Sequence, residues 1–223
     1  MIQFNNVSKL YPNRYEALSS VSFSLKKGEM AFLTGHSGAG KTTLLKLIAL
    51  LERPSRGQII VNQQNLNRLK PSAIPYMRRN CGLIFQTPSL LVDRTLFENI
   101  SLPLIIAGYR FQEISRRVRA ALDKVGLLNK EKLFPGMLSC GEQQRAGIAR
   151  AIVSKPSIIL ADEPTGNLDP SLSAEIMHLF EQFKQVGVTI LIASHDLALI
   201  KQMHHRIITL SHGRLTNDVS GEL

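Results

Sequence analysis

Residues 33–51, LTGHSGAGKTTLLKLIALL, constrain the fold of this chain more than any other segment. They continue an apolar run that begins at Met30, and residues 35–42 fit the pattern G-x-x-x-x-G-K-[ST] without a mismatch. In that pattern a strand leads into a glycine-rich loop and the loop opens a helix, so that backbone N–H groups point at phosphate oxygens. The segment therefore predicts a strand, a phosphate-binding loop and a helix, in that order.

The residue types in this loop have separate expected roles. The glycines let backbone N–H groups turn inward, Lys41 supplies a mobile positive charge near the outer phosphates, and the Thr42 hydroxyl can hold Mg²⁺. A chance glycine-rich turn is the alternative, and the expected strand before the loop and helix after it count against that alternative. The expected nucleotide-binding residues are Gly35, His36, Ser37, Gly38, Ala39, Gly40, Lys41, Thr42 and Thr43.

A second candidate site lies in residues 157–169, SIILADEPTGNLD. An apolar run ends there in Asp162 and Glu163, which places two acids at the carboxyl end of a buried strand, the edge at which ligands collect in α/β sheets. We expect Asp162 to hold Mg²⁺ through water and Glu163 to polarise the water that attacks the γ-phosphate. A capped strand end before the turn at Pro164 is the alternative.

Apolar runs rich in branched residues alternate with helical patterns along the chain, as in a parallel sheet covered by helices. The expected parallel strands are 30–33, 82–85, 158–161, 188–193 and 207–210. Other segments alternate apolar and polar residues, as half-exposed antiparallel strands do, and these are 2–8, 18–29 and 57–62. The sequence thus predicts an α/β fold with a mostly parallel core sheet beside an N-terminal antiparallel β layer.

The pattern becomes helical between Gln86 and Ile152. Apolar residues recur on one helix face across 114–125, and Gly126 ends that helix. We therefore expect a single domain, 1–223, with an inserted helical lobe. Its expected parts are a nucleotide-binding core with the β layer, 1–86 and 152–223, and the helical lobe, 87–151.

The formal net charge of +10 is uneven, because residues 68–132 hold 12 Lys or Arg against 5 Asp or Glu. This basic segment could face anionic lipid headgroups or an acidic partner, or it could be a solvated helix surface. Nucleic acid is not an expected partner, because no helix-turn-helix, zinc-finger or aromatic ribonucleoprotein pattern is present.

Cysteine usage and hydropathy restrict the setting of the chain. Cys81 and Cys140 lack disulfide or zinc-site spacing, which suits a reducing cytosol. No run approaches the roughly 18 apolar residues that a membrane span needs. Any membrane role should therefore come through a partner.

Together these motifs resemble the nucleotide-binding domain of an ABC ATPase. A P-loop, a helical insertion, the segment LSCGEQQR at 138–145 and the acid pair follow one another in the family's order. The resemblance covers essentially the whole chain. It implies a RecA-like P-loop core, a homodimer, and hydrolysis of ATP to ADP and phosphate with ATP and Mg²⁺ bound.

The resemblance also implies roles for four single residues. Tyr11 would stack on the adenine, although an early tyrosine is commonly a core or edge residue. Gln86 would sense Mg²⁺ and the attacking water, and His195 would contact the γ-phosphate, unless it is an ordinary surface histidine. Asp169 would belong to a loop at the dimer interface. The implied catalytic residues are Glu163, His195 and Gln86, and the implied magnesium-site residues are Thr42, Gln86 and Asp162.

In this family the helix that begins at LS faces the nucleotide held by the other subunit. Ser139 and the helix N-terminus would then complete a site in trans, since unpaired N–H groups and the positive helix end favour phosphate. Ser139 and Glu142 also have the S-x-x-E spacing of a capping box. The family's common L-S-G-G-Q is changed here at Cys140, a reactive thiol or a small packing residue, and at Glu142. The implied trans residues are Ser139, Cys140, Gly141 and Glu142.

Longer stretches, among them residues 28–55 and 147–169, are similar to the family's bacterial cell-division ATPases. That similarity implies a peripheral protein at the cytoplasmic face of the bacterial inner (plasma) membrane. An FtsX-like integral membrane partner would pass its ATP-driven shape change to cell-wall hydrolases during septation. ATPases of lipoprotein-releasing or macrolide-exporting transporters, which share DEPTGNLD, are the alternative. A nucleotide switch that hydrolyses little is disfavoured by the intact Lys41, Asp162, Glu163 and His195.

Residues 94–110, RTLFENISLPLIIAGYR, are expected to form part of a groove for the membrane partner. Four apolar residues of this stretch could instead be lobe core, an alternative that applies most to Ile105 and Ile106. The residues concerned are Leu102, Leu104, Ile105 and Ile106.

Overall fold

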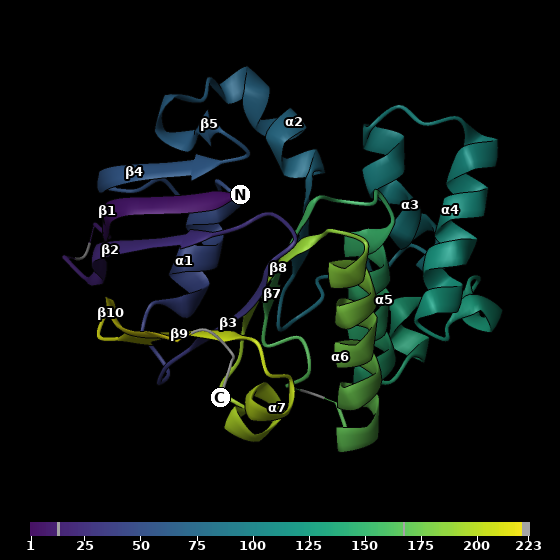
Figure 1. Ribbon diagram of the computed structural model, residues 1–223. Helices are drawn as coiled ribbons and strands as arrows, with labels where there is room; N and C mark the ends of the chain where they lie inside the picture. Colours follow the sequence, from purple (N-terminus) through teal and green to yellow (C-terminus); the bar gives the residue numbers. More distant parts are fainter. Residues whose placement is uncertain (13, 167, 220–223) are drawn as a thin grey trace.

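The computed structural model describes residues 1–12, 14–166 and 168–219, and its strands form two sheets (Figure 1). The antiparallel sheet has the order β2-β1-β4-β5, and its strands are β1 (Ile2–Leu10), β2 (Glu16–Leu25), β4 (Arg56–Val61) and β5 (Gln64–Asn65). The core sheet has the order β10-β9-β3-β8-β7-β6. Its strands are β3 (Met30–Thr34), β6 (Cys81–Ile84), β7 (Ile158–Asp162), β8 (Thr189–Ala193), β9 (Arg206–Ser211) and β10 (Arg214–Val219).

Within the core sheet, β3 pairs in parallel with β8 and β9, and β7 pairs in parallel with β6 and β8. Every residue of β3 and β8 is buried, as expected for strands covered on both faces. The predicted mostly parallel core with an antiparallel layer is therefore confirmed. The mostly exposed β10 adds an antiparallel edge to β9 that the apolar runs did not predict.

One predicted strand, 18–29, is too long at its carboxyl end. The strand β2 stops at Leu25, because the backbone turns at Gly28, whose φ is 72°. The Glu29 carboxylate accepts a hydrogen bond from the Lys26 N–H at 2.6 Å across this turn. The alternation of the sequence did not register this local hydrogen bond.

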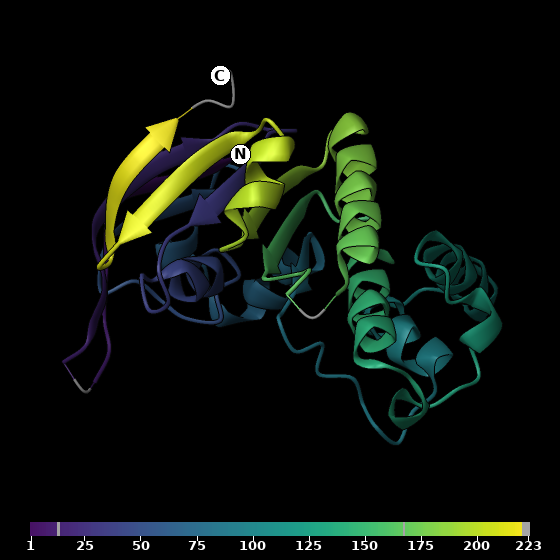
Figure 2. The same cartoon turned by 90° about the horizontal axis from the view of Figure 1, so that it is seen from below.

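The helices lie on both sides of the core sheet. The α-helices are α1 (Lys41–Ile48), α2 (Ile74–Arg79), α3 (Leu96–Ile106), α4 (Phe111–Lys124), α5 (Cys140–Ile152), α6 (Pro170–Gln185) and α7 (Leu197–Gln202). Short 3₁₀ turns are η1 (Leu66–Arg68), η2 (Pro71–Ala73), η3 (Leu128–Lys130) and η4 (Pro135–Met137). Figures 1 and 2 show α3 and α4 far from the antiparallel sheet, with α5 and α6 standing between. No helix of the described ranges is both long and apolar enough to span a bilayer.

Two hydrophobic clusters cover the two faces of the core sheet. Successive residues of β3 alternate between them: Phe32 belongs to the cluster with α3–α6, and Leu33 to the cluster with α1 and the antiparallel sheet. The predicted apolar face of α4 is buried in the first cluster, including Val118 and Leu122. Full burial of each such side chain contributes about 1.5–3 kcal/mol. These two clusters fix the sheet between its helices.

The helix α5 packs against both α3 and β6. It thus touches elements on either side of the expected boundary between core and lobe. The division at residues 87 and 151 stays a prediction, and the last expected core range ends in residues 220–223, outside the described part.

The segment before α3 is fastened by one buried side chain, Asn99, which has no exposed surface. Its Oδ1 accepts a hydrogen bond from the Leu91 N–H at 2.7 Å, and its Nδ2 donates to the carbonyls of Leu91, Arg94 and Thr95 at 3.0–3.1 Å. The Thr95 and Glu98 side chains cap the same helix start reciprocally. Asn99 therefore holds the path of the loop that leads into α3.

We expect Asn99→Ala to lower the free energy of unfolding by about 2–3 kcal/mol, because it leaves several buried backbone groups without partners. Urea unfolding of the variant and the parent would measure this difference. The exposed Asn129→Ala is the matched control and should change stability little. Equal effects of the two substitutions would contradict the structural role of Asn99.

Candidate nucleotide-binding site

The carboxyl ends of β3, β7 and β8 meet at one cavity of about 460 Å³. The cavity brings together residues from across the described chain. Its lining consists of Tyr15, Gly35, His36, Ser37, Gly38, Ala39, Gly40, Lys41, Thr42, Thr43, Gln86, Asp162, Glu163 and His195. The whole expected phosphate loop, the acid pair, Gln86 and His195 therefore share one space, as parallel strand ends at one sheet edge require.

Two glycines let the loop lie directly on neighbouring backbone. Gly35 has a φ of 145°, and a Cβ added there would lie 2.2 Å from the Leu210 carbonyl oxygen. Gly40 has a φ of 106°, and its added Cβ would lie 2.5 Å from the Ala17 carbonyl oxygen. A side chain at either position would push the loop away from β9 or β2. These close approaches explain why the motif needs glycine at its two ends.

The start of α1 is electrostatically suited to an anion. Its N-cap is Gly40, which offers no side-chain acceptor, and its first turn holds no acidic residue. The first N–H groups of a helix have no partner within the helix and carry the positive end of its dipole. This helix start therefore offers its donors to a phosphate group.

Lys41 lies across the mouth of the loop. Its Nζ donates to the Gly35 carbonyl at 2.7 Å and to the His36 carbonyl at 3.2 Å. These bonds hold the ammonium group where an outer phosphate oxygen could replace one of the carbonyl oxygens as its hydrogen-bond acceptor.

Thr42 and Asp162 join the loop to β7. The Thr42 hydroxyl donates to Oδ2 of Asp162 at 2.7 Å. Burial raises the pKa of Asp162 above its ordinary value, the Thr42 hydrogen bond opposes this rise, and the nearby Glu163 charge adds to it. A cation bound here would relieve the cost of burying this carboxylate.

The donor set fits Mg²⁺, which prefers hard oxygen ligands such as hydroxyl, carboxylate and amide oxygens. Thr42, Asp162 and Gln86 supply these three kinds of oxygen within the one cavity. Across the described ranges, no group of three or more His, Cys, Asp or Glu residues could hold a metal ion. The protein ligands alone would not complete an octahedral shell, so the fit requires phosphate oxygens or water as well.

Glu163 and His195 form a contact at the edge of the cavity. Nδ1 of His195 lies 2.8 Å from Oε1 of Glu163, and the two side chains are 72% and 13% exposed. The backbone of Glu163 has a φ of 49° and donates its N–H to the Ala193 carbonyl at 2.9 Å. A non-glycine residue in this left-handed region stores about 1–3 kcal/mol of strain, which is common at functional sites. At this turn Glu163 lines the same cavity as the phosphate loop.

One of the two early tyrosines lies at the cavity, and it is Tyr15. Tyr15 lines the cavity and donates its hydroxyl to the Gly38 carbonyl at 3.0 Å, whereas Tyr11 does not line the cavity. The Tyr11 ring lies 6.5 Å from that of Tyr15 and carries Lys9 Nζ 4.9 Å above it. Tyr15 was missed because nothing in its sequence neighbourhood marks it; only the turn between β1 and β2 brings it to the loop. A role of Tyr11 in adenine binding stays a prediction.

The LSCGEQQR segment lies outside this cavity and caps α5. Oγ of Ser139 accepts from the Glu142 N–H at 3.3 Å, and Oε2 of Glu142 accepts from the Ser139 N–H at 2.9 Å, so the capping box is confirmed. Hydrogen bonds from Lys130 and from the Ser139 backbone lower the pKa of the Glu142 carboxyl. Cys140 is exposed, which excludes the alternative of a buried packing residue.

Neither Gly141 nor Asp169 reaches the cavity either. Oδ1 of Asp169 accepts from the Leu172 N–H at 3.0 Å and caps α6. A single chain therefore assembles the phosphate loop, the acids, Gln86 and His195, but not the trans residues or Asp169.

Comparison with known proteins gives full-length relatives. The cell division ATP-binding protein FtsE of Escherichia coli K12 is 57% identical over 222 residues, covering 100% of both chains. The protein of the same name from Bacillus subtilis is 41% identical, covering 99% of this chain and 96% of that protein. Among solved structures, the dimeric ATP-binding cassette MJ0796 in a post-hydrolysis state bound to ADP and Pi matches with a TM-score of 0.94. It is 33% identical and both chains are covered completely.

The sequence profile described as ABC transporter matches residues 18–166, a range that contains the phosphate loop, LSCGEQQR and the acid pair. The profile spans more than half of the chain, and its motifs are those that meet at the cavity or cap α5. This chain therefore belongs to the ABC transporter family, as one of its ATP-binding cassette ATPases.

Proposed function

We propose that this chain is the ATP-binding and ATP-hydrolysing subunit of an ABC-type membrane complex that acts in bacterial cell division. The observation that carries the enzymatic part is the meeting of Lys41, the Thr42–Asp162 pair and Glu163 in one cavity. The cell-division role is supported by full-length relatives with that name in E. coli, Haemophilus influenzae and B. subtilis. None of these names supports the lipoprotein-releasing or macrolide-exporting alternative.

In the proposed reaction, the β- and γ-phosphates of ATP lie along the N–H groups at the start of α1, and Lys41 bonds the outer oxygens. Thr42, Asp162 and Gln86 would hold Mg²⁺, which when bound neutralises charge on the phosphates. Glu163 accepts a proton from the attacking water as a general base. His195 contacts one oxygen of that carboxylate, so that the other is free for the water.

We propose further that two copies form the complete site. Ser139 and the exposed start of α5 lie outside their own chain's cavity, and an exposed helix N-terminus favours phosphate. The dimeric relative MJ0796 supports this arrangement. In such a dimer of this chain, the γ-phosphate held by one copy would face four residues of the other: Ser139, Cys140, Gly141 and Glu142. Asp169 would lie near the contact between the copies.

A cavity of about 1210 Å³ lies between α2, β6 and the α3–α4 turn. It supports the expectation that residues 94–110 form part of a groove for the membrane partner. Leu104 is buried core, whereas Ile105 and Ile106 are exposed, so the core alternative applies to Leu104 and not to Ile105 or Ile106. Leu102, Ile106 and Tyr109 line this cavity beside Arg79 and Arg110. We propose that a short helix of an FtsX-like integral membrane protein binds here and holds the chain at the cytoplasmic face of the inner membrane.

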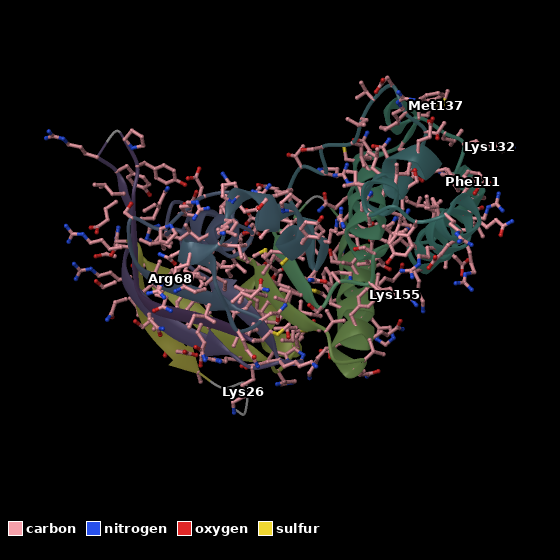
Figure 3. All side chains as sticks on the ribbon, turned by 90° about the horizontal axis from the view of Figure 1, so that it is seen from above. Lys26, Arg68, Phe111, Lys132, Met137 and Lys155 are labelled. Carbon is pink, nitrogen blue, oxygen red and sulfur yellow. The ribbon has the colours of Figure 1, made fainter. Side chains whose placement is uncertain are left out.

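The same end of the molecule carries further exposed apolar side chains. Figure 3 shows Phe111, Lys132 and Met137 on the helical side, opposite Arg68 and Lys26. Phe111 and Met137 are both exposed. Partner binding through this side would leave the antiparallel sheet free of the membrane protein, since none of its residues lines the groove. The cell-wall hydrolases controlled by such a partner lie beyond the part of the complex that this chain contacts.

We expect Glu163→Gln to bind ATP, to hydrolyse it about 10²–10⁴-fold more slowly, and to accumulate as an ATP-bound dimer, because it keeps the shape of the site but loses the base. Phosphate release and sedimentation with and without ATP would measure these effects. The exposed Glu175→Gln on α6 is the control and should hydrolyse ATP at the parent rate. A Glu163→Gln protein with parent turnover would exclude Glu163 as the base.

The raised pKa of Asp162 predicts a pH-dependent stability of the nucleotide-free protein. Ionising this carboxyl destabilises the folded state relative to the unfolded state. The destabilisation is absent below the pKa that Asp162 has in the unfolded protein. It grows as pH rises and is complete above the pKa that Asp162 has in the folded protein. Asp162→Asn cannot ionise and should gain stability over the parent as pH rises toward neutrality. Urea unfolding of both proteins over a pH series would measure the gain, and a gain independent of pH would contradict the account.

We expect Ile106→Asp to weaken recovery of the chain with native membranes several-fold while leaving its affinity for ATP unchanged, because Ile106 is 67% exposed in the proposed groove and does not line the nucleotide cavity. Membrane copurification and labelled-ATP titration would separate the two properties. Val186→Asp, an equally drastic change at an exposed position after α6, should leave membrane recovery intact. If both variants were lost from the membrane fraction, the effect of Ile106→Asp would not be specific to the groove.

A further inference from the structure

The segment that carries Gln86 is held by the buried face of α5. Nε2 of Gln144 donates to the Phe85 carbonyl at 3.2 Å, directly before Gln86. Arg150 donates through Nη1 to the Ser89 carbonyl at 3.0 Å and through Nη2 to the Pro88 carbonyl. Gln86 therefore lies between two sets of hydrogen bonds that come from one helix.

The two side chains that make these bonds are costly to bury. Gln144 is 2% exposed, and its Oε1 has no hydrogen-bond partner among the described residues. A buried acceptor without a partner costs about 1–3 kcal/mol. A short apolar side chain at this position would avoid that cost, but it would release the Phe85 carbonyl. The amide therefore favours one position of Phe85.

Arg150 is also costly to remove from water, because its guanidinium carries a full positive charge. Burial lowers the pKa of its guanidinium, and no ion pair of Arg150 occurs in the described ranges. The carbonyls of Pro88 and Ser89 are the partners that compensate for its desolvation. Moving residues 88–89 away would leave a half-buried cation poorly paired, so Arg150 resists that movement.

A glycine on α5 completes the fit. A Cβ added at Gly147 would lie 2.7 Å from Cβ of Pro88 and 3.5 Å from its Cα. The contact is with a rigid ring and not with the end of a flexible side chain, so the segment would have to shift. Gly147 thus sets the distance between α5 and residues 85–89, while Arg150 and Gln144 set their orientation.

We propose that Arg150 is a positioning residue for Gln86: with Gln144 and Gly147, it fixes residues 85–89 so that the Gln86 amide faces the Thr42–Asp162 pair. Gln86 lines the nucleotide cavity, whereas Arg150 does not. A side chain that touches the reacting groups needs a rigid support, since a displacement of about 1 Å can cost 10²-fold in rate. The inference rests on the proposed ATPase role of Gln86.

The test measures ATP hydrolysis, ATP affinity and the Mg²⁺ concentration that gives half-maximal rate in a double-mutant cycle of Arg150→Met and Gln86→Ala. We expect Arg150→Met to lower kcat about tenfold, to leave the affinity for ATP within about twofold, and to raise the Mg²⁺ requirement. In the Gln86→Ala background, Arg150→Met should add less than about a twofold loss, because it then has no Gln86 to position. The exposed Arg116→Met on α4 is the matched control and should behave as the parent.

Two further variants cover a failure of Arg150→Met to fold. Gly147→Ala should reproduce the loss of kcat by displacing Pro88, and Arg150→Lys should give an intermediate loss, since an ammonium group cannot reach both carbonyls in the fork geometry of arginine. Thermal unfolding of each variant would show that the compared proteins are folded. Equal losses from Arg150→Met in the two backgrounds would overturn the inference. Unchanged kcat in folded Arg150→Met and Gly147→Ala would also overturn it.

The same experiment separates this inference from the proposed function. If Gln86→Ala hydrolyses ATP at the parent rate, the proposed role of Gln86 is wrong, whatever Arg150 does. If Gln86→Ala is slow and Arg150→Met is normal, only the positioning role of Arg150 is wrong.

Discussion

The hydrogen bond between the Thr42 hydroxyl and the Asp162 carboxylate joins two parts of the chain that are 120 residues apart. It forms because β3, β8 and β7 run in parallel, so that the loop after β3 and the acids after β7 emerge at one edge of the sheet. The hydrophobic clusters on both faces hold that sheet in place. The candidate site therefore depends on strand pairing that is buried and distant from solvent. Gly35 and Gly40 then let the phosphate loop lie in direct contact with the backbone of β9 and β2.

The helix α5 relates the site to the rest of the molecule in two ways. Its first turn, capped by Ser139, does not line the chain's own cavity, and a helix start of this kind is suited to a phosphate held by another copy. Its buried face holds the backbone on either side of Gln86. The exposed groove near α3 lies on the lobe side of the same helix, with Arg150 among its lining residues. A membrane partner in that groove would thus contact the residue that we propose to position Gln86.

The sequence predicted that the glycine-rich loop follows a strand and that the acid pair ends another, because each is a local pattern attached to one strand. It predicted the parallel core for the same reason, since continuous apolar runs mark strands buried on both faces. It did not predict Tyr15 at the loop, because the β1–β2 turn and not the spacing of residues brings that ring there. Nor did it predict the bonds from Gln144 and Arg150, since these depend on how α5 packs on the segment after β6. The edge strand β10 was missed because its side chains are mostly exposed.

We propose that two copies complete each site, with Lys41 from one and Ser139 from the other. Mixing two inactive proteins, Lys41→Ala and Ser139→Arg, tests this claim directly, because the mixed dimer would contain one site with both residues intact and one site with neither. We expect each protein alone to hydrolyse almost no ATP and the mixture to regain a substantial part of the parent rate. A mixture as inactive as its two components, in which sedimentation shows that mixed dimers form, would contradict the shared site.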